Sequence, residues 1–367
     1  MEIPTDRVEK AQRLLAEQNY DLLVLFPSSN MLYLSGFYDE PMERMLFFIL
    51  PREGVPVFLV PELYEGQVKE ESPFPEVRVW KDSEDPRKLL QRTLAELAPG
   101  AAKVLVDDGM WALFLLMLRE VLPGADFFLA SRIMKRLRMR KTPDEVRYLE
   151  EAGAIADQAF EEVTRMDIEG MTELALASRI EEVMKKRGAD KIAFETLVAS
   201  GPNGALPHHR AGRRRIEQGD AVILDYGCRI RGYCSDITRT IVCKRASKEI
   251  QIVHEIVNSA QEKAVRAVGP GVEARAVDRS TREEIAKKGY GERFIHRTGH
   301  GIGLEVHEEP YITESNALEL QEGMTFSVEP GIYLPGKFGV RIEDIVVVVQ
   351  AGAKRLNHCS HALQVVG

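Results

Sequence analysis

The sequence predicts two domains: an α/β domain over residues 1–131 and an α+β domain over residues 145–367, joined by a linker over residues 132–144. Three observations support this fold class. The chain has 367 residues, more than a single domain usually contains. Helix and strand patterns alternate through the first third of the chain. The remainder contains two similar halves in succession.

The first domain alternates amphipathic and buried apolar segments. The pattern predicts a helix over 7–18, a buried strand over 21–26, hairpin strands over 45–50 and 55–60, and further helix and strand signals over 104–107 and 110–121. This alternation is typical of an α/β sheet domain. We find no catalytic constellation in it.

The linker is polar and basic, and it ends in a helix-start signal. Thr142 can cap the next helix, Pro143 suits its first turn, and Asp144 and Glu145 suit the positive end of the helix dipole. The second domain is therefore expected to start with a helix from about residue 144.

The second domain contains an internal repeat. Each half predicts a long helix, at about 144–165 and 247–267, followed by a glycine and a second helix that ends at another glycine. These glycines are Gly170 and Gly188 in the first half and Gly271 and Gly289 in the second, so the halves are offset by 101 positions. Each half continues into strands that end in a hairpin. The repeat predicts two similar halves that face each other across a site.

Composition and charge exclude several functional classes. Apolar residues at 44% and charged residues at 29% are ordinary for a soluble globular protein. The net charge is −8 and basic residues are scattered, which argues against a nucleic-acid partner. The cluster Arg213, Arg214 and Arg215 is interpreted as a solvated loop or an interface. No membrane partner is expected, because the longest apolar stretch, 112–118, is too short to span a bilayer.

The cysteines and the N-terminus predict a cytoplasmic protein. Cys228, Cys234, Cys243 and Cys359 show no CxxC spacing and are expected to be free thiols. The first fifteen residues are charged and lack the apolar run of a signal peptide. Cys234 shares the predicted face of Asp236; it either approaches a metal site or is a small buried side chain, and the second interpretation is favoured.

Two predicted β-hairpins each place a pair of acids face to face. In the ribbon from Ala221 to Cys243, folding between Ile230 and Arg231 puts Asp225 opposite Asp236. Folding the later ribbon about Gly336 puts Glu329 opposite Glu343 and turns Asp344 to the other face. Like charges directly opposite each other destabilise a hairpin, and a cation between them removes the repulsion.

The segment between the hairpins adds histidines to this set. It reads HRTGHGIGLEVHEEP and contains His296, His300 and His307 among glycines that allow close backbone approach. Four carboxylates and an imidazole suit two divalent ions, such as Mn, Co, Zn or Fe. Water between such ions is an expected nucleophile, because metals lower its pKa. Alone, one acid pair could be a salt-bridged surface, and a glycine-rich histidine segment could be a turn; two pairs favour the metal site.

These motifs resemble peptidase family M24, the metallopeptidases of pita-bread fold, in the branch of Xaa-Pro dipeptidase (prolidase) and aminopeptidase P. The matching segments are SGPNGALPHH, LDYGCRIRGYCSDITRT, HRTGHGIGLEVHEEP, SVEPGIY and GVRIED. The segment NMLYLSGF resembles the smaller creatinase/prolidase N-terminal-like domain of this branch. The resemblance implies a pita-bread catalytic domain, a pseudo-twofold repeat and a homodimer.

The resemblance also implies roles for individual residues. Asp225 would chelate one metal, Asp236 and Glu343 would bridge both, and His300 and Glu329 would hold the other. His208 and His307 would position the substrate and stabilise the tetrahedral intermediate, and Glu329 would carry the proton to the leaving proline nitrogen. Arg341 would orient a carboxylate or bind substrate. His209 is interpreted as a polar loop residue, and His254 and His296 as structural.

The expected reaction is hydrolysis of Xaa-Pro bonds with two divalent ions, manganese above all. An Xaa-Pro dipeptidase is favoured over an Xaa-Pro aminopeptidase. A dipeptidase must hold the free substrate carboxylate, ideally with arginine, but no Arg or Lys occurs between His307 and Glu329. Arg341, Arg297, Arg210 or a residue of the small domain could serve. A metal-independent creatinase-like hydrolase and a non-enzymatic scaffold are remoter alternatives, because the ligand set is intact.

Overall fold

The computed structural model describes residues 6–367 and divides into two compact units, Met1–Arg138 and Met139–Gly367. Residues 1–5 of the predicted first domain, with the start of the charged N-terminus, lie outside the described residues. Helix α6 (Ser131–Arg138) occupies most of the segment that the sequence assigned to a linker. It packs against α1 and buries Ile133 and Met134, and such packing of one face stabilises a helix. Within residues 6–367, no helix combines the length and apolar character that a membrane span requires.

The first unit is a six-stranded mixed sheet with the strand order β4-β3-β2-β1-β5-β6. Its strands are β1 (Leu22–Leu25), β2 (Phe47–Pro51), β3 (Val57–Pro61), β4 (Val77–Trp80), β5 (Lys103–Val106) and β6 (Asp126–Leu129). Its other helices are α1 (Asp6–Glu17), α2 (Ser29–Ser35), α3 (Glu65–Glu71), α4 (Pro86–Leu97) and α5 (Ala112–Val121). The predicted hairpin is confirmed, since β2 and β3 pair antiparallel. The α/β character of this unit is confirmed.

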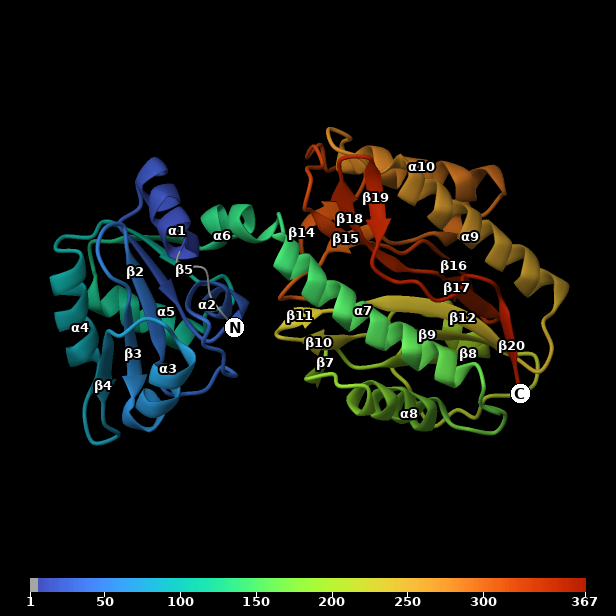
Figure 1. The fold of residues 1–367 in the computed structure, drawn as a ribbon, viewed down its shortest axis with the longest axis horizontal. Coiled ribbons are helices and arrows are strands. Elements are labelled where there is room, and N and C mark those ends of the chain that lie inside the picture. Colours follow the sequence, from blue (N-terminus) through green and yellow to red (C-terminus); the bar gives the residue numbers. More distant parts are fainter. Residues whose placement is uncertain (1–5) are drawn as a thin grey trace. The chain divides into compact units, whose positions relative to one another are not determined.

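The second unit contains the predicted repeat. Its helices are α7 (Pro143–Val163), α8 (Glu173–Lys186), α9 (Lys248–Ala267) and α10 (Ala274–Lys287). Helix α7 has 21 residues and α9 has 20, while α8 and α10 have 14 each. The glycines after the helices in both halves share a positive φ: 76° at Gly170, 100° at Gly188, 80° at Gly271 and 83° at Gly289. The two halves therefore repeat one local fold, as the sequence predicted (Figure 1).

The start of α7 is fixed by the predicted signals. The Thr142 side chain accepts a hydrogen bond from the backbone N–H of Glu145, and the Glu145 side chain accepts one from the backbone N–H of Thr142. Pro143 occupies the first turn. This capping box satisfies two of the N–H groups that a helix start otherwise leaves unpaired.

The second unit has two main sheets; in Figure 1, α8 lies below their strands, α9 and α10 lie above, and α7 crosses in front. One has the order β20-β12-β9-β8 and the other β14-β13-β15-β18-β19. The strands of this unit are β7 (Lys191–Ile192), β8 (Leu197–Ser200), β9 (Ala221–Tyr226), β10 (Cys228–Ile230), β11 (Tyr233–Cys234), β12 (Ile237–Cys243), β13 (Gly299–Gly301), β14 (Glu308–Ile312), β15 (Thr325–Val328), β16 (Gly331–Leu334), β17 (Phe338–Arg341), β18 (Asp344–Val349), β19 (Gly352–Arg355) and β20 (Gln364–Val366). One apolar core joins α7 and α8 to β9 and β12, and another joins α9 and α10 to β15 and β18.

The register of the later hairpin agrees with the prediction. Strands β16 and β17 pair Leu334 with Phe338, so the ribbon folds about Gly336. Strands β15 and β18 continue the same register and pair Val328 with Asp344. Glu329 therefore lies opposite Glu343, as expected from the sequence.

The register of the earlier hairpin differs from the prediction. Asp225 lies opposite Thr238, and not opposite Asp236. The turn centres on Arg231 and Gly232, which both have positive φ (49° and 84°), so the ribbon folds one residue later than expected. A shift of one residue in the turn moves each partner by two positions, which preserves the face of every side chain. Asp225 and Asp236 are thus diagonal neighbours on one face.

Candidate metal centre and active site

A cavity of about 700 Å³ in the second unit collects the predicted site residues. That volume is in the range of pockets for small ligands. The acids and the imidazole lie on strands or directly beside them. Asp225 is on β9 and His300 on β13, while Asp236 directly precedes β12, Glu329 directly follows β15 and Glu343 directly precedes β18. The predicted residues His208, His307 and Arg341 also line the cavity.

Three of these side chains converge closely. Single ligand atoms of Asp236, His300 and Glu343 all lie within 4.8 Å of one another. Glu329 extends the cluster, because its Oε1 lies 3.4 Å from His300 Nε2, while Asp236 Oδ2 lies 3.7 Å from the same nitrogen. Such a mixture of buried carboxylate oxygens and an imidazole nitrogen suits divalent transition metals.

The acids of the cluster have buried oxygen atoms for which the polypeptide supplies no partner. Within the described part of the chain, Asp225 Oδ1, Asp236 Oδ1 and Glu343 Oε1 are buried without a hydrogen-bond partner. Burial and then the neighbouring carboxylates raise the pKa of Asp236 and of Glu343 well above the usual range. Burial also raises the pKa of Glu329, to about 7. Unpaired buried charge is costly, so these residues fit a site for divalent cations.

His300 presents the correct nitrogen to this cluster. Its Nδ1 lies 3.1 Å from the carbonyl oxygen of Gly301, so the Nδ1–H tautomer donates there and leaves Nε2 as a ligand atom. Burial lowers the pKa of His300 to about 3, which keeps the ring neutral. The ring of His307 packs edge-on against it, with centroids 4.1 Å apart.

Arg341 holds one of the acids in place. Its guanidinium donates to Asp225 Oδ2 at 2.5 Å, to Tyr333 Oη at 2.8 Å and to Thr238 Oγ1 at 3.2 Å. Thr238 in turn donates to Glu343 Oε2 at 2.6 Å. Arg341 thus orients a carboxylate, which is one of the two roles considered for it.

A buried glutamate that sequence reasoning missed shapes the loop that carries His208. Glu173 at the start of α8 accepts hydrogen bonds from Ser200, Asn203 and the backbone of Gly212, and it lies 2.8 Å from His209 Nε2. His209 is therefore a loop-fixing residue, although it also lines the cavity. An acid at a helix start gave no signal of this role, because its partners lie about 30 residues away.

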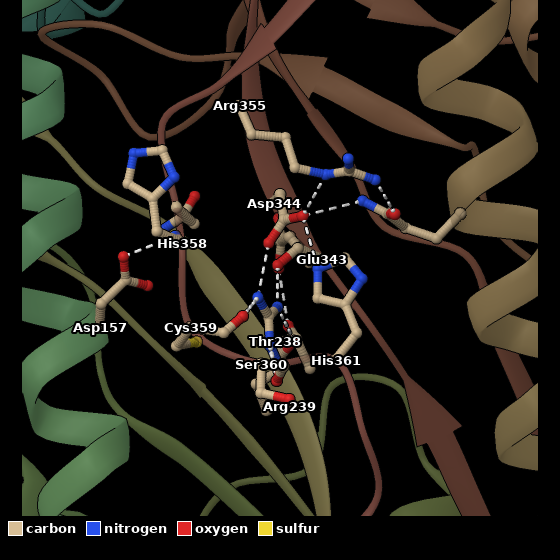
Figure 2. Close-up of polar contacts among 12 residues, drawn as sticks. Asp157, Thr238, Arg239, Glu343, Asp344, Arg355, His358, Cys359, Ser360 and His361 are labelled. Carbon is tan, nitrogen blue, oxygen red and sulfur yellow. Dashed lines mark hydrogen bonds and ion pairs between the residues drawn. The ribbon is translucent and has the colours of Figure 1, made fainter.

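A polar network that the sequence did not reveal lies next to Glu343 (Figure 2). Arg239 donates to the backbone oxygen of Glu343 at 2.6 Å and to Asp344 Oδ1 at 2.7 Å. Asp344 also accepts from Arg355 at 2.9 Å and contacts His361 Nε2 at 2.7 Å. The only sequence signal was that Asp344 turns away from the metal face. This network anchors the strand that carries Glu343.

The remaining predicted residues take other positions. His296 lines the cavity and contacts Tyr333 Oη at 2.8 Å, whereas His254 is buried on α9 and does not line the cavity. All four cysteines are free, as predicted, and all four are buried. Cys234 does not line the cavity, and burial raises its thiol pKa to about 12, as befits a small buried side chain.

Comparison with known proteins agrees with this geometry. The family model of metallopeptidase family M24 matches residues 147–350, and that of the creatinase/prolidase N-terminal domain matches residues 7–140. The chain belongs to metallopeptidase family M24. A probable dipeptidase PepE of Mycobacterium tuberculosis (strain ATCC 25618 / H37Rv) is 39% identical over 100% of this chain and 97% of its own length. The Xaa-Pro dipeptidase of Pyrococcus furiosus (strain ATCC 43587 / DSM 3638 / JCM 8422 / Vc1) is 37% identical over 98% of this M24 chain and 99% of its own.

Solved structures show the same similarity to this M24 chain. The recombinant prolidase of Thermococcus sibiricus superposes with a TM-score of 0.95 at 43% identity, covering 99% of each chain. The X-Pro aminopeptidase of Thermotoga maritima MSB8 superposes with a TM-score of 0.88 at 34% identity, covering 98% of this chain and 99% of its own. The expected pita-bread fold with a creatinase-type N-terminal domain is thus confirmed, and the chain is a hydrolase of the metallopeptidase class.

Proposed function

We propose that this M24 metallopeptidase is an Xaa-Pro dipeptidase that uses two divalent ions. The observation that carries the proposal is the convergence of four carboxylates and one neutral imidazole in a cavity where three carboxylate oxygens lack partners. The names of the prolidase relatives and structural neighbours support the choice of substrate. The bond before proline is a tertiary amide without N–H, which gives a dedicated enzyme its niche.

The proposed ligands follow the family motifs. Asp225 would hold one ion, Asp236 and Glu343 would lie between both, and His300 and Glu329 would hold the other. When bound, the ions supply Lewis-acid polarisation of the scissile carbonyl and an acidified water as nucleophile. Manganese is the proposed ion, with cobalt, zinc or iron as the other candidates.

The protein's own groups perform the proton and positioning steps. His208 and His307 line the cavity and, by the proposal, orient the substrate and donate to the developing oxyanion. Burial lowers the pKa of His307, so its ring is neutral at neutral pH and can donate a hydrogen bond without adding charge. Glu329 would take the proton of the attacking water and deliver it to the proline nitrogen.

The test is an assay of metal-stripped protein reloaded with one metal at a time. We expect hydrolysis of Ala-Pro with manganese and none after chelation. Metal analysis should give two ions per chain. Hydrolysis that persists in chelator would instead support the metal-independent creatinase-like reaction, and bound metal without any hydrolysis would support a scaffold.

An Xaa-Pro aminopeptidase is the second candidate, and the Thermotoga neighbour favours it. Its substrates continue beyond the proline, so comparison of Ala-Pro with Ala-Pro-Ala separates the two. A dipeptidase should prefer Ala-Pro by at least ~10-fold, the scale of one charge-assisted hydrogen bond.

A homodimer and a cytoplasmic location are also proposed. Among the described residues of the first unit, seven large apolar side chains are exposed, and three of them lie on or directly before α5: Trp111, Leu113 and Leu116, at 43%, 54% and 54%. Exposed apolar side chains along one helix are typical of a surface covered by another chain. Sedimentation of the wild type and of a Leu113→Ser/Leu116→Ser variant tests the dimer, which the variant should weaken.

A further inference from the structure

We propose that Arg297 binds the free carboxylate of the substrate and thereby makes the enzyme select dipeptides. The inference rests on the proposed function, and it names the residue that separates a dipeptidase from an aminopeptidase. In this proposal Arg297 neither binds a metal ion nor transfers a proton.

Three arginines line the cavity, and two of them are otherwise engaged. Arg341 is buried and donates to Asp225, Tyr333 and Thr238. If it released Asp225 to hold substrate, a partly buried carboxylate would lose its partner, which is costly. Arg210 is 85% exposed and lies 3.8 Å from the exposed Glu195, so its charge is screened by solvent.

Arg297 differs from both, because it is partly buried and has no anionic partner. Its guanidinium carbon lies 4.4 Å from the ring centroid of Tyr311. Among residues 6–367, no carboxylate pairs with it and no hydrogen bond engages its side chain. Stacking leaves the N–H groups at the edge of the guanidinium plane free to bind a carboxylate with two parallel hydrogen bonds.

The backbone holds Arg297 at a fixed place beside the metal centre. His296 Nδ1 lies 2.8 Å from the Arg297 carbonyl oxygen. The next residue, Thr298, donates its N–H and its hydroxyl to the buried Asp278 at 3.0 and 2.8 Å. His300 lies three positions after Arg297. An arginine so placed is ordered before substrate binds, which lowers the entropy cost of binding.

Electrostatics place its charge within reach of the reacting groups. After burial, the positive charge of Arg297 is the next cause that lowers the pKa of His307. The same charge contributes to the lowered pKa of His300. In a dipeptide the carboxylate belongs to the proline that follows the scissile bond, so the anion must bind close to these histidines. A longer peptide places a neutral amide there and leaves the arginine unpaired.

The experiment compares two substrates that differ only at this group, Ala-Pro and Ala-Pro amide. In the wild type with manganese we expect kcat/KM to favour the acid on the order of 10- to 100-fold, the scale of a hydrogen bond between charged groups. Arg297→Gln should lose this preference by lowering kcat/KM for the acid, with the amide almost unchanged. Arg297→Lys should keep part of the preference for the acid, because lysine retains the positive charge but lacks the two parallel N–H groups of the guanidinium.

Two controls accompany the variant. Arg293→Gln removes a nearby arginine that is exposed and does not line the cavity, and it should leave both substrates unaffected. Tyr311→Phe keeps the stacked ring and should keep the preference, whereas Tyr311→Leu should reduce it.

Some outcomes would overturn the inference. An equal loss for acid and amide in Arg297→Gln would show a general effect on the site, and collapse of the preference in Arg210→Gln instead would assign the anchor to Arg210. Calorimetry can also compare the binding of proline with that of prolinamide, and this measurement does not depend on hydrolysis. Suppose that the wild type hydrolyses neither substrate but binds proline more tightly than prolinamide, and that Arg297→Gln alone loses this difference. The dipeptidase function would then be refuted, while the carboxylate site at Arg297 would be supported.

Discussion

At the scale of single residues, the site combines acids that would repel one another in the absence of cations. Asp236 is buried at 4% exposure, with one oxygen unpaired and three other carboxylates contributing to its raised pKa. The same property that makes the residue a good ligand makes it a source of instability in the metal-free protein. Metal binding and metal-free stability should therefore respond in opposite directions to its removal.

Asp236→Asn tests this opposition. We expect loss of metal binding and of at least ~99% of activity, together with metal-free unfolding that is unchanged or more difficult by about 1 kcal/mol, because a like charge has been removed. Metal analysis and urea unfolding in chelator provide the two readouts. A variant that retained two ions per chain and full hydrolysis would contradict the ligand assignment.

His254 makes a prediction about pH. Burial, and then the positive charges of His361 and Arg239, lower its pKa to about 4 from an ordinary value of 6.5. The unfolded chain therefore binds the proton first as pH falls, and folding stability is lost between about pH 6.5 and pH 4. The loss amounts to about 3 kcal/mol at 1.36 kcal/mol per pKa unit.

Urea unfolding of wild type and His254→Gln in chelator, at pH 7.0 and 4.5, measures this effect. Other groups also titrate over this interval, so the difference between the two proteins is the relevant quantity. The variant should lose less stability than the wild type between the two pH values. Parallel losses in both would show that His254 does not titrate with a lowered pKa.

At the scale of elements, β12 and β18 are joined by the Arg239–Asp344 pair (Figure 2). Asp344 is fully buried, and Arg239 also donates to the carbonyl oxygens of Cys359 and Ser360. One side chain thus fixes the position of both a ligand strand and the segment before β20. Removal of one partner from a buried pair leaves an uncompensated charge and usually costs about 3–5 kcal/mol.

Arg239→Met should accordingly lower the free energy of unfolding by about 3 kcal/mol, the lower end of that range, because Asp344 keeps Arg355. Metal affinity should fall as well, since Arg239 holds the backbone of Glu343. The double variant Arg239→Met/Asp344→Asn removes both charges and should recover part of the stability. A loss below about 0.5 kcal/mol in the single variant, as is usual at surface sites, would show that the pair is not structural.

At the scale of the whole molecule, the metal centre links strands from both halves of the second unit. Asp225 and Asp236 come from the first half, while His300, Glu329 and Glu343 come from the second. A ligand that binds only the folded arrangement stabilises it by mass action, by about 3 kcal/mol at a concentration 100 times its Kd. The ions should therefore stabilise the second unit as a whole.

Calorimetry with and without manganese tests this expectation. The transition of the second unit should move to higher temperature with metal. The shift should shrink as pH falls through 7, because protons compete for carboxylates such as Glu329, whose metal-free pKa is about 7. Asp236→Asn should show no shift. An equal shift in that variant would indicate metal binding elsewhere.

The sequence by itself determined the features that depend on local pattern. The two-domain order, the capping box at Thr142 and the helix–glycine repeat follow from neighbouring residues. The Glu329–Glu343 register about Gly336 also follows, because a tight turn fixes a contiguous ribbon. The face shared by Asp225 and Asp236 was predictable from strand parity, although their pairing was wrong by two positions, because the turn lies one residue later.

Only the tertiary structure decided which distant groups meet. The contact of Arg341 with Asp225 spans 116 positions, and that of Arg239 with Asp344 spans 105. The sequence named Arg341 first as a candidate for binding a carboxylate, and it left Arg297, Arg210 and a residue of the small domain open. Folding separates them by exposing Arg210, pairing Arg341 and stacking Arg297 on Tyr311. Such partners are set by how sheets and loops pack across the cavity, and no local periodicity encodes that packing.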